Sequence, residues 1–365
     1  MKKHKICKIL LVILAIFLCV AFYELLGICV AYKKQPEVSN TTKKETKNGS
    51  WNECSENTER AVIIEKNPEA LLQRVRLIKI AKKEIILSTF AFQSDESGKL
   101  ILGALHDAAD RGVHIRLLVD GMESWIDMEG NPYFYGLSSH ENVEIKLYNK
   151  ANPLKPWKIM GRMHDKYLIA DGKRYILGGR NTYNYFLGDF PGHKNYDRDV
   201  LVVCDEPEKE NSVNQLLEYF ETIWEQEDSG YFHDNKKLAN RKSVKNAVLE
   251  LQNGYQKYFE ENKERICDTD YTDETFETEK IALVSNPIHT GSKEPVVWYQ
   301  LGELMKNAKN RVKIHTPYII CNDMMYNTWE EIAENVSDFS IMTNSVANNG
   351  NPFGAADYAK NRNRT

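Results

Sequence analysis

The order of apolar segments between residues 85 and 119 limits the fold of this chain more than any other feature. Residues 85–92 form an apolar, β-favouring stretch, residues 98–111 carry an apolar stripe at helical spacing, and residues 113–119 are again β-favouring. Gly112 ends the predicted helix. A strand, a helix and a strand in this order form a βαβ unit, which pairs its strands in parallel. The sequence therefore predicts an α/β fold.

Further elements extend this unit on both sides. A helix is predicted to begin at Asn67 and Pro68, because asparagine caps a helix and proline suits its first turn. The pattern predicts strands over residues 143–148 and 200–204 and a helix over residues 214–224. We therefore expect a mostly parallel sheet flanked by helices.

The same order of elements returns towards the end of the chain. The pattern there predicts a helix, a strand, a helix and a strand over residues 301–309, 312–320, 327–335 and 339–343. This predicts two related repeats. By the spacing of the first repeat, the functional segment described below should recur at about position 390. Because the chain ends at Thr365, we expect the second repeat to be incomplete.

The N-terminus carries an apolar run long enough to cross a bilayer. Four lysines precede a nearly unbroken apolar stretch over residues 9–32, which only Glu24 and Gly27 interrupt. About 20 apolar residues span the hydrocarbon core, so residues 1–32 are predicted to be a single transmembrane helix that anchors the chain. A signal peptide is the alternative. The early lysines favour a cytoplasmic N-terminus and a globular part outside.

The composition and charge guide the division of the rest of the chain. Lys and Arg number 48 and Asp and Glu 52, so we expect no dedicated nucleic-acid partner. Residues 33–60 are polar and are predicted to be a tether. We divide the remainder into the first repeat, a charged helical connector and the incomplete second repeat, over residues 61–233, 234–280 and 281–365.

Residues 163–181 hold the groups that point to a chemical function. Asp171 and Gly172 separate two short β-favouring stretches, and this dipeptide predicts a tight hairpin. Side chains in a strand alternate between its two faces, so His164 and Lys166 project on the same side. Both can therefore contact one ligand.

The residues after the hairpin complete a site suited to a phosphodiester. Gly178 and Gly179 let the backbone approach a bound group, and the Asn181 amide can donate to a non-bridging oxygen. A phosphodiester gains charge on its oxygens during attack, so Lys166 and Asn181 suit a clamp. A neutral His164 can attack phosphorus as a nucleophile. This arrangement requires neither a metal nor another cofactor.

The second ring nitrogen of His164 needs a carboxylate to fix its tautomer. Asp197 and Asp199, just before the predicted strand at residue 200, are both candidates, and the sequence does not choose between them. Each feature alone has an ordinary explanation: a simple hairpin turn, a polar histidine on a strand, or surface aspartates beside Arg198. The prediction rests on the ordered set.

The spacing of this set resembles the HKD motif of the phospholipase D superfamily at every required position. One departure is Gly179, where many members carry serine. Gly161 before the motif and the Asp-x-Asp pair after it look most like the cardiolipin synthase branch, and weaker similarity extends from residue 69 to the C-terminus, including residues 343–347. The resemblance implies a phospholipase D-like fold, a location in the bacterial plasma membrane and four catalytic residues, namely His164, Lys166, Asp171 and Asn181.

The resemblance also implies an activity. A phosphatidyl group would pass to His164 and then to the hydroxyl of phosphatidylglycerol, with glycerol as the leaving group and no metal. Phospholipids of the phosphatidylglycerol class and the membrane are the expected partners. One alternative is a hydrolase of the same superfamily that acts on phospholipid or nucleic acid. Another is a catalytically silent membrane interaction module.

In the family resembled, two such motifs meet, and one histidine attacks while the other protonates the leaving alcohol. This sequence holds one His-x-Lys-x4-Asp pattern. We therefore expect a truncated chain that lacks its second catalytic half. Two copies that pair as a homodimer, and an inactive protein, are the alternatives.

The segment that leads into His164 mixes cations with apolar side chains. Residues 150–163 contain Lys150, Lys155, Lys158, Trp157, Ile159, Met160 and Arg162. This composition suits an interface with anionic lipid headgroups. The alternative is an ordinary basic loop with a partly buried tryptophan.

Overall fold

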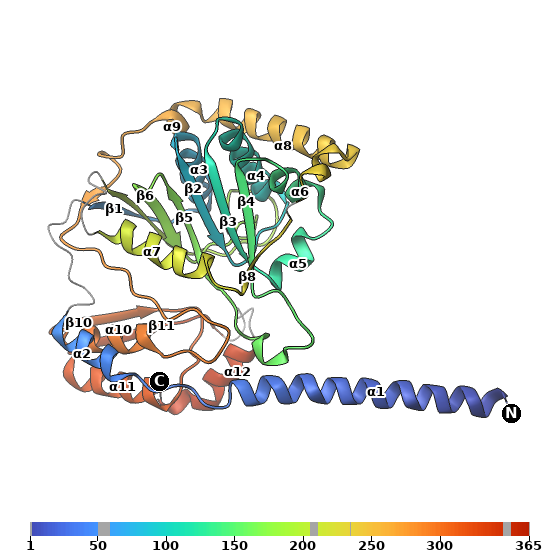
Figure 1. The fold of residues 1–365 in the computed structure, drawn as a ribbon. Helices are drawn as coiled ribbons and strands as arrows, with labels where there is room; N and C mark the ends of the chain where they lie inside the picture. Colours follow the sequence, from blue (N-terminus) through green and yellow to red (C-terminus); the bar gives the residue numbers. More distant parts are fainter. Residues whose placement is uncertain (1, 50–58, 205–210, 234, 346–351, 365) are drawn as a thin grey trace. The chain divides into compact units, whose positions relative to one another are not determined.

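The computed structural model of the chain describes residues 2–49, 59–204, 211–233, 235–345 and 352–364. It divides into two compact units, which are described separately (Figure 1). Unit 1 comprises Met1–Lys34, Asn52–Leu283 and Ile288–Ser292, and unit 2 comprises Gln35–Trp51, Val284–Pro287 and Lys293–Thr365.

Among the described residues, nine strands form the central sheet of unit 1 in the order β8-β4-β3-β2-β5-β6-β7-β1-β9 (Figure 1). They are β1 (Glu59–Ile64), β2 (Glu84–Thr89), β3 (His114–Asp120), β4 (Val143–Tyr148), β5 (Lys166–Ala170), β6 (Arg174–Gly178), β7 (Asp199–Cys204), β8 (Ser229–Tyr231) and β9 (Phe276–Glu277).

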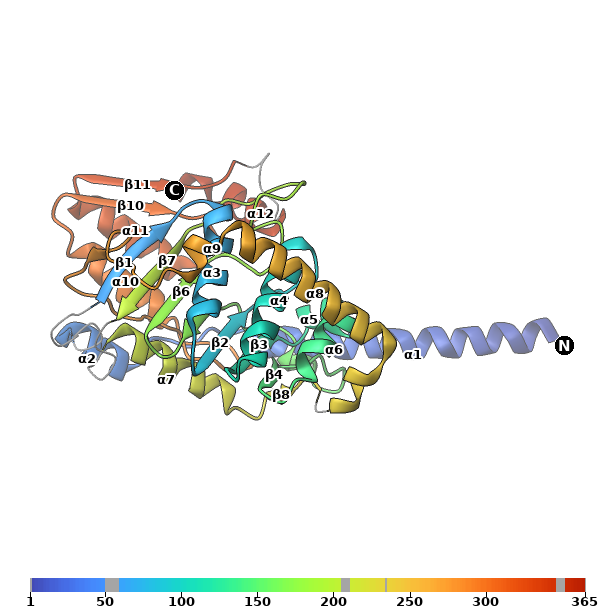
Figure 2. The same cartoon turned by 90° about the horizontal axis from the view of Figure 1, so that it is seen from above.

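Helices cover both faces of this sheet (Figure 2). One face packs against α3 (Asn67–Ile80), α4 (Glu96–Asp110), α6 (Pro132–Ser138) and α8 (Lys242–Glu261), and the other against α7 (Ser212–Trp224). Alternation along β5 links the two cores, since Leu168 lies in the first and Tyr167 and Ile169 lie in the second. The predicted α/β layering is confirmed.

The expected mostly parallel sheet is wrong, because the sheet is mixed. The predicted βαβ unit is present as β2, α4 and β3, and the β2–β3 and β3–β4 pairs are parallel. Within this sheet, the other pairs of described strands are antiparallel. The Asp171-Gly172 turn joins β5 directly to β6, and so short a connection permits only antiparallel pairing, whereas parallel strands need a long crossover.

The segment expected to be a connector contributes to the body of unit 1. The apolar face of α8 packs against α4 and α6, and its buried residues include Val244, Leu251 and Tyr255. Gly103 of α4 permits this contact, since a Cβ there would lie 2.7 Å from the Leu251 carbonyl oxygen. Residues 242–261 therefore form part of a helical layer instead of a free link.

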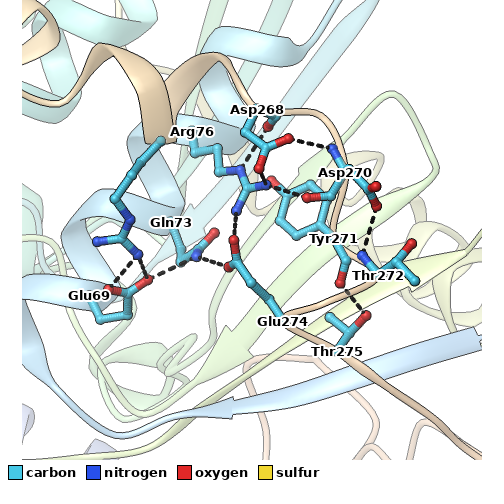
Figure 3. A network of polar contacts seen from close by, with 10 residues as sticks. Glu69, Gln73, Arg76, Asp268, Asp270, Tyr271, Thr272, Glu274 and Thr275 are labelled. Atoms are coloured by element: carbon cyan, nitrogen blue, oxygen red, sulfur yellow. Dashed lines mark hydrogen bonds and ion pairs between the residues drawn. The ribbon is translucent and has the colours of Figure 1, made fainter.

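A buried guanidinium holds the chain that follows α9 (Lys263–Cys267) (Figure 3). Arg76 of α3 donates to the carbonyl oxygens of Asp268 and Asp270 at 2.8 and 2.6 Å. It also donates to Glu274 Oε1 at 2.7 Å, and its guanidinium lies 3.8 Å from the centroid of the Tyr271 ring. This network fixes the path of the chain up to β9.

Unit 2 repeats part of the element order of unit 1. It contains α2 (Asn40–Asn48), α10 (Val296–Lys306), β10 (Arg311–His315), α11 (Asp323–Asn335), β11 (Asp338–Met342) and α12 (Pro352–Asn361). Because β10 and β11 pair in parallel, the series from α10 to β11 has the order and pairing of α3, β2, α4 and β3. The extent of the second repeat stays a prediction, and residues 346–347 lie outside the described residues.

The N-terminal apolar run forms one continuous helix, α1 (Lys2–Ala31). Its segment Ile6–Ala31 is long and apolar enough to cross a membrane, and the predicted apolar helix is therefore confirmed. Length and composition suit an anchor and a signal sequence alike. The stretch expected to be a tether, residues 33–60, contains α2 and the start of β1, and its residues 50–58 lie outside the described part of the chain.

Candidate active site

The predicted histidine and lysine lie at one edge of the sheet of unit 1. Lys166, the first residue of β5, stands opposite Thr89 at the end of β2, and the two strands are antiparallel. The start of β5 therefore meets the carboxyl ends of the parallel strands β2, β3 and β4. Open α/β sheets bind ligands at the carboxyl ends of their strands, so this edge is where a site is expected.

One aromatic ring supports both predicted groups. The His164 side chain is exposed on one side, and its ring centroid lies 4.6 Å from that of Phe90. Lys166 Nζ lies 5.3 Å from the same Phe90 centroid and donates to the His164 carbonyl oxygen at 2.6 Å. Asp165, between them, accepts a hydrogen bond from the Tyr219 hydroxyl on the opposite face. The alternation predicted from the sequence is therefore confirmed.

The surroundings favour a neutral imidazole beside a charged ammonium. Partial burial, followed by the charge of Lys166, lowers the pKa of His164 to about 4, although Asp120 opposes this shift. Burial also lowers the pKa of Lys166 to about 8, against the opposing charges of Asp165, Asp197 and Asp120. At neutral pH the imidazole has a free lone pair and the lysine is mostly protonated. This is the protonation state that nucleophilic attack on an anionic diester requires.

The Asn181 side chain faces the same edge. Its Oδ1 accepts a hydrogen bond from the backbone N–H of Ala91, which follows β2, at 3.2 Å. The neighbouring Thr182 N–H donates to the Ala91 carbonyl oxygen at 3.1 Å. These contacts direct the amide nitrogen of Asn181 away from Ala91, and it remains a donor for a ligand oxygen.

The two glycines make room for the two aspartates. A Cβ on Gly178 would collide with the Asp199 carboxylate, and a Cβ on Gly179 would collide with the Asp197 carboxylate. Asp197 therefore packs directly on the backbone at Gly179. A serine at position 179 is incompatible with this placement of Asp197, which explains why glycine suits this chain.

The structure separates the roles of the two aspartates. Asp199 is fully buried and its Oδ2 pairs with Arg74 at 2.9 Å and with Arg180 at 3.2 Å. Both guanidinium groups are themselves buried. Because Asp199 is held by these arginines, it does not orient the imidazole. Asp197, whose charge acts on Lys166, stays a prediction for that role, and Asp120 is the carboxylate whose charge acts on His164.

Asp171 does not lie with the other predicted catalytic residues. It follows the far end of β5 with a φ of 54°, about 16 Å of extended strand away from Lys166. Its carboxylate accepts hydrogen bonds of 2.7 to 3.1 Å from the backbone N–H groups of Lys82, Lys83 and Glu84. We expected Asp171 among the catalytic residues. In the structure its hydrogen bonds instead hold the β5–β6 hairpin against the start of β2.

The sequence reasoning missed Asp120. This buried residue ends β3, and its carboxylate accepts hydrogen bonds from the Arg162 guanidinium at 2.9 and 3.0 Å and from the Met163 N–H at 3.0 Å. It thereby fixes the backbone immediately before His164. An aspartate at the carboxyl end of a predicted parallel strand was the available signal. In the part of the chain that the structure describes, no group of three or more histidine, cysteine or carboxylate side chains is arranged to hold a metal ion.

Comparison with known proteins identifies the domain that carries these residues. Residues 74–224 match the family model described as "Cardiolipin synthase, PLD-like domain". An uncharacterized protein of Helicobacter pylori is 27% identical over 315 residues, which cover 79% of this chain and 59% of that protein. Cardiolipin synthase C of Escherichia coli K12 is 29% identical over 171 residues, which cover 43% of this chain and 34% of that protein.

A solved structure supports the fold. Phosphatidylserine synthase of Haemophilus influenzae Rd KW20 matches with a TM-score of 0.54 and 15% identity, and the match covers 83% of this chain and 66% of that one. The chain spans about three fifths of the length of the H. pylori relative and about one third of the E. coli relative. The resemblance inferred from the motif is confirmed: residues 74–224 form a phospholipase D-like domain similar to that of bacterial cardiolipin synthases.

Proposed function

We propose that this protein is a membrane-anchored phosphatidyltransferase of the phospholipase D type, similar in activity to cardiolipin synthases. The observation that carries the proposal is the placing of His164 and Lys166. A neutral imidazole lies beside an ammonium at the edge where the parallel strands of the sheet end. It does so within a domain that matches a cardiolipin synthase family model.

In the proposed first step, a ring nitrogen of His164 attacks the phosphorus of phosphatidylglycerol. A P–N bond forms, the P–O bond to the glycerol headgroup breaks, and the glycerol oxygen takes up a proton. Lys166 and the Asn181 amide stabilise the charge that grows on the non-bridging oxygens. In the second step, a hydroxyl of another phosphatidylglycerol attacks the phosphohistidine and loses its proton, the P–N bond breaks, and cardiolipin is formed.

The glycerol leaving group needs a proton donor, because an alkoxide is a poor leaving group. With a pKa of about 4, His164 acts as the nucleophile and not as this acid. We propose that a second imidazole is supplied either by a further catalytic half or by another copy of the chain in a homodimer. Asp197 is proposed to orient the nucleophilic ring.

The helix α1 supports the membrane part of the proposal. Its apolar segment has 26 residues, about 39 Å of helix, against about 30 Å for the hydrocarbon core. None of the most apolar stretch is buried in protein, so this helix is not part of a soluble core. We propose that it anchors the chain in the bacterial plasma membrane.

The test uses the full chain reconstituted in vesicles that contain phosphatidylglycerol labelled in its phosphate. We expect labelled cardiolipin and an acid-labile label on the protein, both abolished in His164→Ala. His114→Gln is the matched control, because His114 begins β3 at the opposite edge of the sheet, and it should retain activity. Phosphatidic acid as the sole product would favour a hydrolase. Absence of any product or labelled protein would favour a silent interaction module.

A second substrate separates the role of the nucleophile from that of the proton donor. A p-nitrophenyl ester of phosphatidic acid releases a stabilised anion, which leaves without prior protonation. We expect this ester to label His164 even under conditions in which glycerol release from phosphatidylglycerol is slow. Failure of the ester to label the protein would refute the assignment of His164.

A further inference from the structure

Exposed apolar side chains gather on two segments that leave the sheet beside the site. The first is α5 (Glu123–Met128), where Trp125 is 67% and Ile126 77% exposed. The second is the loop after β4, which contains the short helix η2 (Pro156–Lys158) and in which Leu154 is 77% exposed. Six residues make up this surface, which we call the apolar lip: Met122, Trp125, Ile126, Leu154, Trp157 and Met160.

Both parts of the lip belong to the edge that carries His164. The strands β3 and β4 are parallel neighbours, and Asp120 at the end of β3 pairs with Tyr148 at the end of β4. The segments that follow them therefore emerge side by side.

A single buried carboxylate joins the two parts. Asp120 accepts hydrogen bonds from the N–H groups of Met122 and Glu123, at 3.1 and 3.2 Å, where α5 begins. The same carboxylate binds Arg162 and the Met163 N–H, where the loop ends. The lip is thus fixed to the backbone that precedes His164.

The loop of the lip lies against the apolar helix α1. The Tyr23 hydroxyl donates to the Leu154 carbonyl oxygen at 2.9 Å. At Gly27, a Cβ would lie 2.5 Å from Pro156 Cγ, so the small residue allows close approach. Tyr23 lies eight residues before Ala31, the last residue of the apolar segment, which is about 12 Å of helix.

This contact sets the depth of the loop in a bilayer. The apolar segment is about 39 Å long and exceeds the hydrocarbon core by about 9 Å. If the excess is shared between the two ends, Tyr23 lies about 8 Å inside the boundary of the hydrocarbon. Interfacial apolar surfaces insert to about 5–10 Å, and Leu154 at the level of Tyr23 matches that depth.

We propose that the apolar lip inserts into the bilayer that holds α1, so that a phospholipid reaches His164 without leaving the membrane. The delivery of substrate rests on the proposed function, whereas insertion does not. Two lysines of the loop already have partners in the protein: Lys150 donates to the Tyr231 carbonyl oxygen at 2.7 Å and Lys158 pairs with Asp228 at 2.6 Å. We therefore propose that burial of apolar area drives insertion. The lip should bind zwitterionic and anionic bilayers equally well, whereas the loop sequence alone predicts a preference for anionic lipid.

The test measures tryptophan quenching in the full chain, reconstituted in phosphatidylcholine vesicles with or without acyl chains brominated near the glycerol. The chain has six tryptophans, so single Trp→Phe variants isolate their contributions. We expect Trp125→Phe and Trp157→Phe to lower the quenched fraction of the emission. Trp224→Phe removes a buried tryptophan at the end of α7 and should raise the quenched fraction. His164→Ala should leave it unchanged, which separates insertion from catalysis.

The result that would overturn the inference is a quenched fraction that rises in Trp125→Phe and Trp157→Phe as it does in Trp224→Phe. It would show that protein, and not lipid, covers the lip. A kinetic test complements this result: Ile126→Asn should slow turnover of vesicle phosphatidylglycerol by about tenfold while leaving cleavage of a water-soluble short-chain ester unchanged. Equal loss on both substrates would contradict delivery through the lip. If the wild-type chain shows the expected quenching but does not act on phosphatidylglycerol, the proposed function alone is refuted.

Discussion

Substitution of Asp199 tests whether this residue stabilises the fold while Asp197 acts at His164. It lies buried between Arg74 and Arg180, and both arginines contact its Oδ2. Asp199→Asn can present its amide oxygen at the same position, so the contacts with both guanidinium groups survive and the negative charge is lost. Two buried guanidinium groups then remain without a counter-charge.

The expected cost follows from this geometry. Removal of one partner of a buried ion pair costs about 3–5 kcal/mol. Because Asp199→Asn keeps its hydrogen bonds, we expect about 3 kcal/mol, and we expect about 5 kcal/mol for Asp199→Ala, which keeps none. For a unit of this size, 3 kcal/mol lowers the Tm by about 6–12 °C. Arg180 also donates to the carbonyl oxygens of Ile64, Glu65 and Asp197, so the ends of β1 and β7 should loosen together.

The assay is thermal unfolding of the full chain in detergent micelles, with Asp197→Asn as the matched control. Asp197 is partly exposed, so this variant should change the Tm little and should reduce phosphoenzyme formation instead. The reasoning is refuted if Asp199→Asn melts like the wild type, or if Asp197→Asn is the less stable of the two.

Three further predictions concern the site. First, Asp171→Asn removes a charged acceptor from three backbone N–H groups and should cost about 1–3 kcal/mol in denaturant unfolding, while labelling of His164 per folded molecule stays unchanged; a selective loss of labelling would restore a catalytic role. Second, Gly179→Ala should displace Asp197 and lower the labelling rate. In an Asp197→Ala background the same substitution should have little further effect. Additive losses in this double-mutant cycle would exclude the contact between position 179 and Asp197. Third, the labelling rate at saturating ester should fall as pH drops through about 4, where His164 gains a proton, and as pH rises through about 8, where Lys166 loses one. Lys166→Arg should abolish the alkaline limb, and a wild-type profile with an acidic limb near the ordinary imidazole pKa of about 6.5 would contradict the proposed surroundings of His164.

Much of the fold and of the site could be predicted because it depends on neighbouring residues. The alternation of a strand puts His164 and Lys166 on one face whatever surrounds them, and Asp171-Gly172 forces the hairpin that brings Asn181 back to the same edge. The βαβ order of residues 85–119 required β2 and β3 to be parallel. These features are determined by the geometry of a few consecutive residues or of a single βαβ crossover.

Other features depend on contacts between distant residues, and the sequence pattern did not contain them. The mixed sheet follows from the pairing of β2 with β5 and of β1 with β7, and no local signal specifies either pair. The packing of α8 on α4 and α6 was also missed, because a charged helix with a narrow apolar face resembles a connector when its partner is unknown.

The sequence by itself determined that His164 and Lys166 share one face and that an apolar helix precedes the domain, since helix and strand periodicity are properties of the backbone. Only the tertiary structure decided which carboxylate serves which group. Asp199 belongs to Arg74, 125 residues away, Asp171 holds the N–H groups before β2, and Asp120 joins the lip to His164. The physical reason is that a buried charge takes the partner the packed chain brings to it, and that partner depends on the whole fold.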